Sequence, residues 1–180
     1  MKQKILLVSH CFFNDAAKLK NQNKTEMEEE RSVKKKFLKR ALDAGIELIQ
    51  LPCPELILYG SDRWGHSASQ FDHPHFRQEA RKMLEPILLQ IKEYMAHSER
   101  FEVLGVLGID GSPSCGIHYT FDGAWGGEFT GNDELERTLA DLDKVNRPAI
   151  FMDVFRRMLS EEQLLIEFYS TDTFPDSLME

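Results

Sequence analysis

Short apolar runs alternate along the chain with longer segments whose apolar residues recur every three or four positions. Continuous apolar runs are typical of strands buried on both faces of a parallel sheet, and they occupy residues 4–9, 46–51, 102–109 and 148–152. Helical spacing is typical of amphipathic helices, and it occurs over residues 27–44, 74–96, 132–143 and about 160–168. Because strands and helices alternate, we predict an α/β fold. It is a single-domain, Rossmann-like three-layer arrangement over residues 1–180, with a mostly parallel sheet of about four strands.

The predicted helices carry end signals and apolar stripes. Pro74 suits a first helical turn, Gly45 suits a helix C-terminus, and Ser160 with Gln163 forms a candidate capping box. On the first helix, the stripe expected to face the core is Val33, Phe37, Leu38, Ala41 and Leu42. The basic residues expected on its solvated face are Lys34, Lys35, Lys36, Lys39 and Arg40. The leucines expected to face inward on the helix at 132–143 are Leu135, Leu139 and Leu142.

Overall charge and hydropathy narrow the possible partners. The 180 residues carry a formal net charge of −8, whereas binding duplex nucleic acid through its phosphates needs a basic surface. No stretch approaches the roughly 20 apolar residues of a membrane span. The apolar run after Lys4 is interrupted by His10 and is too short for a signal peptide. We therefore expect a cytoplasmic protein that binds neither duplex nucleic acid nor a membrane.

The chain contains three cysteines, Cys11, Cys53 and Cys115. An odd number excludes a complete disulfide framework, and their wide separation excludes a CxxC-type metal motif. Cys11 and Cys53 each come two residues after a predicted strand, and Cys115 lies in the loop after the third. In a parallel sheet these loops open at the same edge, where α/β proteins bind ligands. We therefore expect the three thiols to converge there.

Three convergent thiolates without a fourth suggest a soft-metal site with an open position. One alternative is zinc, with His10 or His118 as the fourth ligand. Another is an iron–sulfur cluster, which normally has four thiolates. With three, one iron stays free to bind an exogenous ligand as a thiophilic Lewis acid. A further alternative is three incidental buried thiols, because free cysteine is often buried.

Polar residues beside two of the cysteines fit a reactive site. Glu55 is a candidate general acid or base, and its alternative is a helix-capping or solvent-facing residue. Ser112 and Ser114 are candidates for hydrogen bonds to cluster sulfur or substrate, and their alternative is ordinary turn chemistry. We expect Gly111 and Gly116 to allow the backbone to approach a bulky ligand.

Three more residues are candidates for substrate binding. Trp64 could stack on a flat heterocycle while Arg63 donates hydrogen bonds to it; the alternative is a pair of rim residues packed on the long helix. Asn14 could face the same pocket or cap a turn of the chain. The glycine-rich segment 123–131 indicates a turn or short hairpin, or else a mobile lid.

These residues resemble the TudS family, the iron–sulfur-dependent desulfidases typified by thiouracil desulfidase. The matching segments are ILLVSHC at 5–11, LPCPE at 51–55 and GIDGSPSCG at 108–116, in the family's order. The segments that follow the first two cysteines differ from the family's usual sequences, which indicates a divergent branch. The resemblance implies a 4Fe-4S cluster held by three cysteine ligands, Cys11, Cys53 and Cys115, with one open iron that takes the sulfur of the substrate.

The resemblance also implies a reaction. Sulfur would be removed hydrolytically, without net redox change, from a small thiolated heterocycle or nucleobase-like substrate, leaving a carbonyl and releasing sulfide. The catalytic glutamate and serine of the family map onto Glu55 and Ser112. Two other functions stay open on the residues alone. One is an iron–sulfur or metal-binding redox sensor without catalysis, and the other is a metal-free sulfurtransferase that forms a persulfide on one cysteine thiolate.

Overall fold

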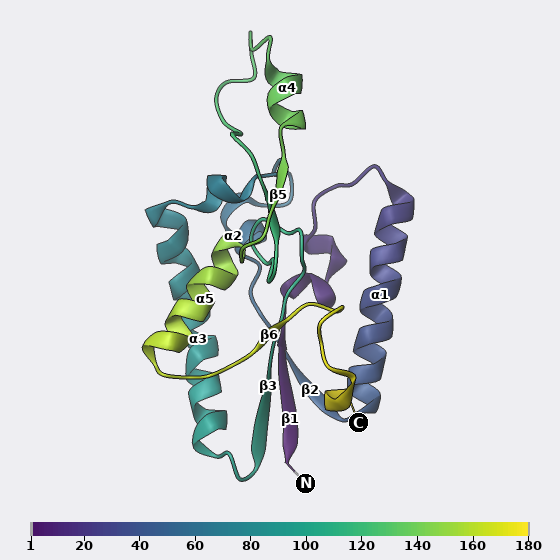
Figure 1. Ribbon diagram of the computed structural model, residues 1–180, viewed down its shortest axis with the longest axis vertical. Helices are drawn as coiled ribbons and strands as arrows, with labels where there is room; N and C mark the ends of the chain where they lie inside the picture. The colour runs from purple at the N-terminus through teal and green to yellow at the C-terminus, as the bar shows by residue number, and fades with distance from the viewer. Residues whose placement is uncertain (1, 180) are drawn as a thin grey trace.

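The computed structural model describes residues 2–179, and a parallel sheet lies at its centre (Figure 1). Within these residues, four strands hydrogen-bond in the order β2, β1, β3 and β6, and every pairing is parallel. The strands are β1 (Gln3–Val8), β2 (Ile46–Gln50), β3 (Phe101–Leu107) and β6 (Phe168–Tyr169). The predicted α/β fold with a mostly parallel sheet is confirmed, and the first three strands lie where the apolar runs placed them.

Helices cover both faces of the sheet and complete the three layers. Helix α1 (Lys24–Asp43) lies on one side, and α3 (Pro74–Ala96) and α5 (Ile150–Glu161) lie on the other (Figure 1). Successive side chains of a strand point to opposite faces. Accordingly, Leu7 of β1 joins the core built by α3 and α5, whereas Leu6 joins the core against α1. The central strand is therefore buried on both faces, as its unbroken apolar sequence indicates.

Helix α3 begins and ends where the sequence predicts. Pro74 occupies its first turn, where a missing N–H breaks no helical hydrogen bond, and the His73 ring accepts a hydrogen bond from the Phe76 N–H. Its buried stripe consists of Phe76, Ala80, Leu84, Ile87, Leu88 and Ile91. Apolar periodicity predicts this helix well because the helix packs against its neighbours along most of its length.

The stripe on α1 is displaced from the one we predicted. Phe37 and Ala41 are buried as expected, but Val33 is 48% exposed and Leu42 is 61% exposed. Lys34, expected on the solvated face, is instead buried at 4% exposure. It precedes Phe37 by three positions and Ala41 by seven, so the three side chains share one helical face.

The predicted fourth strand and last helix are wrong. Residues 148–152 lead into α5, whose buried side chains follow helical spacing. The predicted capping box at Ser160 and Gln163 ends this helix and begins no other: the Gln163 N–H donates to the Ser160 carbonyl, and Gln163 has a φ of 58°. The Leu164 N–H donates to the Leu159 carbonyl, which completes a Schellman motif. The chain then returns to the sheet as β6.

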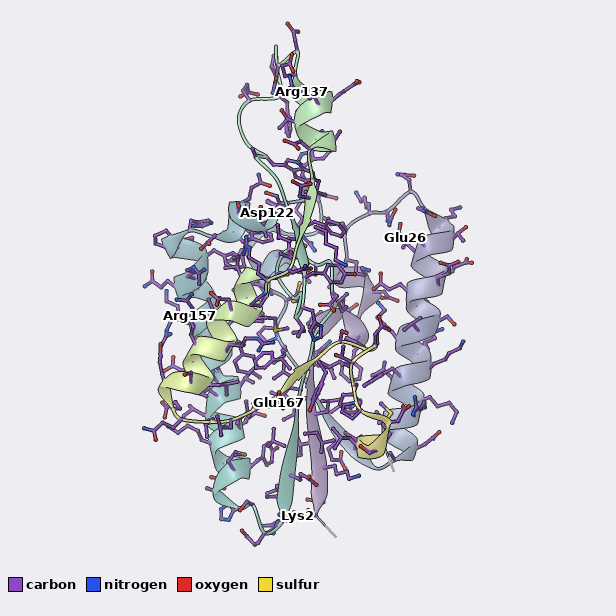
Figure 2. The ribbon with its side chains drawn as sticks, viewed as in Figure 1. Lys2, Glu26, Asp122, Arg137, Arg157 and Glu167 are labelled. Carbon is purple, nitrogen blue, oxygen red and sulfur yellow. The ribbon has the colours of Figure 1, made fainter. Side chains whose placement is uncertain are left out.

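Residues 120–145 form an arm that projects from the body of the protein (Figure 1). Its base is an antiparallel pair, β4 (Thr120–Asp122) with β5 (Asp143–Val145), and α4 (Leu135–Ala140) lies farther out. The helix predicted over 132–143 is therefore shorter than expected. No residue of α4 is buried, so the inward packing expected of its leucines is wrong. Figure 2 shows Arg137 on the outer part of the arm and Asp122 at its base.

The remaining elements are short. They are α2 (Pro54–Tyr59) and the 3-10 helices η1 (His10–Phe12), η2 (Asp15–Ala17), η3 (Ala68–Phe71) and η4 (Asp176–Met179). Two of them matter for the site, because η1 follows β1 and α2 follows β2. Across residues 2–179, no helix has the length and apolar character needed to cross a bilayer.

Candidate functional site

The carboxyl ends of the three central strands lie level with one another. In the register of the sheet, the last residue of β1 is opposite the last residue of β2 and the last residue of β3. The segment after each strand carries one cysteine: Cys11 lies in η1, Cys53 directly precedes α2, and Cys115 lies in the loop after β3. All three thiols therefore lie at the edge where ligands bind in parallel α/β sheets.

Burial dominates the chemistry of these thiols. Burial raises the pKa of Cys11 to about 12, against the opposing charges of Lys34 and Lys18. It also raises the pKa of Cys53, and it raises the pKa of Cys115 with the help of the two neighbouring cysteines. The three groups therefore lie close enough to act on one another. Each is a neutral thiol at pH 7, and binding a metal would release its proton.

The arrangement of donors bears on which metal they fit. Within residues 2–179, no group of three His, Cys, Asp or Glu side chains is set up to hold a metal ion. Zinc needs its sulfur and nitrogen donors at about 2.0–2.3 Å. His118, one proposed fourth ligand, contacts Asp110 Oδ2 through Nδ1 at 2.8 Å, a contact of the kind that orients a histidine to bind a metal through its other nitrogen. Thiolates that each bind a different iron of a cluster lie farther apart.

A buried carboxylate connects two of the cysteine-bearing segments. Glu55, in the first turn of α2 after Cys53, is 7% exposed. Its Oε1 accepts a hydrogen bond from the Ser114 hydroxyl at 2.6 Å, and its Oε2 accepts one from Arg63 Nε at 3.3 Å. The Ser114 Oγ also lies 3.5 Å from the Cys115 Sγ. A carboxylate and a hydroxyl group thus stand beside the third cysteine, ready to exchange a proton.

The two serines of the GSPSCG loop make different contacts. Ser112 Oγ accepts hydrogen bonds from the Ser114 N–H at 3.3 Å and from the Cys115 N–H at 3.0 Å. These bonds shape the turn that presents the cysteine. We predicted Ser112 as the catalytic serine and Ser114 as a substrate ligand, but the contact with Glu55 belongs to Ser114. The geometry therefore favours Ser114 for proton transfer and Ser112 for holding the turn.

Arg63, predicted to bind substrate, is occupied with the protein itself. Its side chain is only 4% exposed. Besides Glu55, its guanidinium donates to the Gly60 carbonyl and to the Ala17 carbonyl, each at 2.8 Å. Arg63 therefore fastens the loop after α2 to the segment after Cys11, and it fixes the direction of the Glu55 carboxylate.

Asn14 and Trp64, the other predicted substrate ligands, lie in different surroundings. Asn14 Oδ1 accepts a hydrogen bond from the Ala16 N–H at 3.1 Å, and its Nδ2 lies 3.3 Å from His10 Nε2. These contacts agree with the alternative in which Asn14 caps a turn of the chain. Trp64 is 76% exposed and lines a cavity beneath the arm, where it is free to contact a ligand.

The glycines of the third loop serve the loop's own packing. A Cβ atom on Gly116 would lie 2.4 Å from the Tyr119 carbonyl oxygen and 3.0 Å from that of Ser112. Gly111 has a φ of 84°, a conformation that other residues rarely adopt. The expected close approach is therefore between two parts of the protein backbone rather than between the backbone and a ligand.

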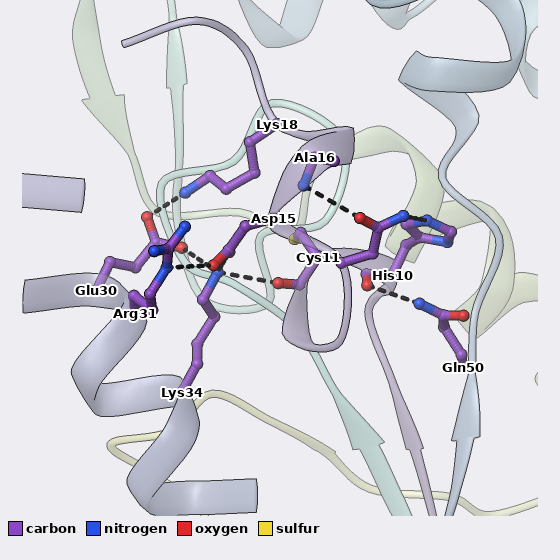
Figure 3. A network of polar contacts seen from close by, with 10 residues as sticks. His10, Cys11, Asp15, Ala16, Lys18, Glu30, Arg31, Lys34 and Gln50 are labelled. Carbon is purple, nitrogen blue, oxygen red and sulfur yellow. Dashed lines mark hydrogen bonds and ion pairs between the residues drawn. The ribbon is translucent and has the colours of Figure 1, made fainter. Parts of the chain in front are cut away.

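Lys34 is a site residue that we did not predict. Figure 3 shows its side chain reaching from α1 to the turn that carries Cys11, where the ammonium group donates to the Cys11 carbonyl at 2.9 Å and pairs with Asp15. Glu30 lies 3.2 Å away on the previous turn of α1. Lys34 thereby holds the turn that carries the first cysteine and places a positive charge near its sulfur. Its helical spacing from Phe37 was the signal that could have identified it.

We expect the substitution Lys34→Met to destabilise the protein by about 2–3 kcal/mol. Removing one member of a buried group of paired charges leaves the remaining charges uncompensated. When all of the charges are buried, this lowers the free energy of unfolding by about 3–5 kcal/mol. Asp15 and Glu30 are 28% and 32% exposed, which reduces the loss. Urea unfolding measures it. The matched control is Lys35→Met on the exposed face, with a change within about 0.5 kcal/mol; equal losses in both variants would contradict the buried role.

The protein is therefore an α/β protein with a parallel sheet. Three thiols and a carboxylate–serine pair lie at the carboxyl edge of that sheet. The chain is 31% identical over 115 residues to the uncharacterized protein MJ0003 of Methanocaldococcus jannaschii, a match that covers 64% of this chain and 69% of that protein. The chain belongs to the same protein family as this archaeal protein. No family profile matches the chain, and no solved structure matches it.

Proposed function

We propose that the protein is a 4Fe-4S-dependent desulfidase, with Cys11, Cys53 and Cys115 as the cluster ligands. The observation that carries the proposal is the position of three mutually interacting cysteines at the carboxyl edge of the sheet, Cys115 buried and the other two partly buried, with the Glu55–Ser114 pair beside them. A structural role alone would not need three thiols at three strand ends. A cluster with three protein ligands explains both their number and their positions.

The proposed reaction is the hydrolysis of a thiocarbonyl in a small thiolated heterocycle. Water oxygen forms a bond to the ring carbon, the carbon–sulfur bond breaks, and both protons of the water leave with the sulfur as hydrogen sulfide. No electrons are gained or lost. When bound, the cluster supplies a thiophilic Lewis acid that polarises the carbon–sulfur bond.

The residues of the chain supply the proton transfers. Glu55 takes a proton from the attacking water and returns it to the departing sulfur, a role that contributes about 10²- to 10⁴-fold in rate. The Ser114 hydroxyl, hydrogen-bonded to Glu55 at 2.6 Å, relays or orients that proton. Arg63, through its bond to Glu55 Oε2, keeps the carboxylate in place. Burial of the pair excludes bulk water from the reacting atoms.

The burial of the thiols also argues against the metal-free alternative. A sulfurtransferase needs a reactive thiolate, and such thiolates have a lowered pKa. Here burial raises the pKa of each cysteine, so little nucleophilic thiolate is present at pH 7. Measuring turnover distinguishes a desulfidase from a redox sensor. A sensor would bind a cluster but would release no sulfide from a thiocarbonyl compound.

The test is to purify the protein without oxygen and measure its metal content. We expect a brown protein that bleaches in air and contains about four iron atoms and four acid-labile sulfides per chain after reconstitution. One zinc ion per chain, or a colourless protein that takes up no iron under reconstitution, would contradict the proposal.

A further inference from the structure

The arm, residues 120–145, carries most of the negative charge of the protein. It holds seven carboxylates against two basic side chains, a net charge of −5, whereas the whole chain has −8. Two of the carboxylates form ion pairs, Glu134 with Arg137 and Asp122 with Arg147. Within residues 2–179, the other five are exposed and form no ion pair: Glu128, Asp133, Glu136, Asp141 and Asp143.

The same arm exposes apolar side chains. They line a cavity of about 770 Å³ between the arm and the segment that follows α2. Among the lining residues, Trp64 is 76% exposed, Phe129 52% and Leu139 44%, and the ring centroids of Trp64 and Phe129 are 5.8 Å apart. Leu135 lies one helical turn before Leu139 on α4 and lines the cavity with it. A contiguous exposed apolar surface of this kind, bordered by charged residues, is typical of an interaction site.

Polar contacts hold the base of the arm against the body, so this surface is formed in advance. Asp122, labelled in Figure 2, accepts hydrogen bonds from the Ser69 N–H at 2.9 Å and the Ser69 hydroxyl at 2.8 Å. It also accepts one from the Arg147 guanidinium at 2.8 Å. The Ser67 hydroxyl donates to the Gly123 carbonyl at 3.0 Å. A preformed surface costs its partner little ordering of the protein.

The charge of the arm selects the kind of partner. Exposed carboxylates repel the phosphates of nucleic acid and the headgroups of an anionic membrane, and they repel the equally acidic arm of a second copy. They attract lysine and arginine side chains. Among the described residues, no Asp, Glu, Lys or Arg side chain lines the cavity itself. The complementary surface therefore has apolar side chains that enter the cavity and cations beside them that meet the carboxylates.

We propose that the arm and the cavity form a docking surface for a basic amphipathic helix of a partner protein. Such a helix carries apolar anchors along one face and cations on the faces beside it, and it binds by laying the apolar face into a groove. The anchors contact Trp64, Phe129 and Leu139, and the lysine and arginine side chains pair with the exposed carboxylates of the arm. The proposal is independent of the desulfidase function, because the cavity is lined by none of the three cysteines and by neither Glu55 nor Ser114.

Binding of a designed peptide to the full-length protein tests this assignment. The probe is a peptide of about 18 residues, made of leucine and lysine at amphipathic helical spacing. The peptide has no tryptophan, and both tryptophans of the chain, Trp64 and Trp125, line the cavity, so a change in tryptophan fluorescence reports on this surface. We expect saturable one-to-one binding that weakens at least about 10-fold between about 0.05 M and about 0.5 M salt, because salt screens exposed charges. The same peptide with glutamate in place of lysine should not bind.

Matched variants locate the binding on the arm. Trp64→Ala should weaken peptide binding by about 10-fold or more, as loss of a central aromatic anchor does. The double variant Glu128→Gln with Glu136→Gln should weaken it by about 3-fold or more at low salt. The control, Glu99→Gln with Glu102→Gln, removes the same charge from exposed positions near the start of β3, at the opposite end of the molecule from the arm (Figure 1). It should leave the affinity within about 2-fold, because charges beyond the screening length contribute little.

Several outcomes would overturn the assignment. They are the absence of peptide binding, equally tight binding of the acidic peptide, equal losses in the two double variants, and an unchanged affinity in Trp64→Ala. Sedimentation velocity of the free protein tests the other occupant, a second copy. Self-association that Trp64→Ala abolishes would show that another copy of the chain covers this surface. Tighter binding to vesicles containing phosphatidylserine than to the basic peptide would likewise replace the protein partner by a membrane.

Discussion

Replacing any one of Cys11, Cys53 and Cys115 by alanine is expected to lower sulfide release by at least about 100-fold. Loss of a residue that merely supports a metal ligand costs about 10- to 100-fold in affinity or activity, and loss of a ligand itself costs more. Because the chain has three cysteines, no spare thiol can replace the missing one. Iron content and sulfide release are measured on each variant after identical anaerobic reconstitution.

The comparison among the three variants carries its own control. In the cluster account all three cysteines are equivalent ligands, so all three variants should lose iron together with activity. Thermal unfolding of each cluster-free variant shows whether the fold is kept. If a single cysteine were essential, and the other two variants kept full activity in air and in the presence of a chelator, a persulfide on that cysteine would replace the cluster account.

The substitution Glu55→Gln is expected to separate the cluster from turnover. Gln is close in size to Glu; its amide oxygen can still accept from Arg63 while its NH₂ group donates to the Ser114 oxygen, so the fold and the iron content should stay close to wild type. Glutamine cannot take up the proton of the attacking water, so sulfide release should fall by about 10²- to 10⁴-fold. The measurement is sulfide released per cluster, with iron quantified in the same samples.

The two serines provide a matched pair for this prediction. Ser114 contacts Glu55, whereas Ser112 accepts hydrogen bonds from the backbone of its own loop. Ser114→Ala should therefore slow turnover per cluster, while Ser112→Ala should lower the unfolding temperature and leave turnover per cluster within a few-fold of wild type. The reverse result would return the catalytic role to Ser112. Undiminished turnover in Glu55→Gln would remove Glu55 from the reaction.

Much of the fold follows from the sequence because its helices and strands are buried in regular ways. The continuous apolar run of β1 reflects burial on both faces, and the period of α3 reflects packing along most of the helix. The prediction fails at residues 148–152, where an apolar run of five residues fits a strand or a buried helical turn equally well. It also fails in the arm, because α4 buries none of its residues and so its leucines do not mark a core.

The cysteines could be placed from the sequence because the ends of parallel strands share one edge of the sheet. The hydrogen bonds around these cysteines could not be predicted from the sequence. Ser112 and Ser114 are two residues apart, and only the turn that the loop adopts decides which hydroxyl reaches Glu55. The sequence predicts a solvent-facing Lys34 because four other basic residues follow it closely on the helix. Burial of a lysine depends on partners such as Asp15, which lies in a segment with no periodic pattern.

The most direct test of the central claim is turnover in ¹⁸O-labelled water. Reconstituted wild-type protein is incubated without oxygen with neutral thiolated bases, 2-thiouracil and 4-thiouracil, and sulfide and product are both quantified. Hydrolytic desulfidation predicts one sulfide per uracil formed, one ¹⁸O atom in the new carbonyl, and no need for a reductant. Sulfide release no greater than from cluster-free protein, or sulfur retained on a cysteine as a persulfide, would contradict it.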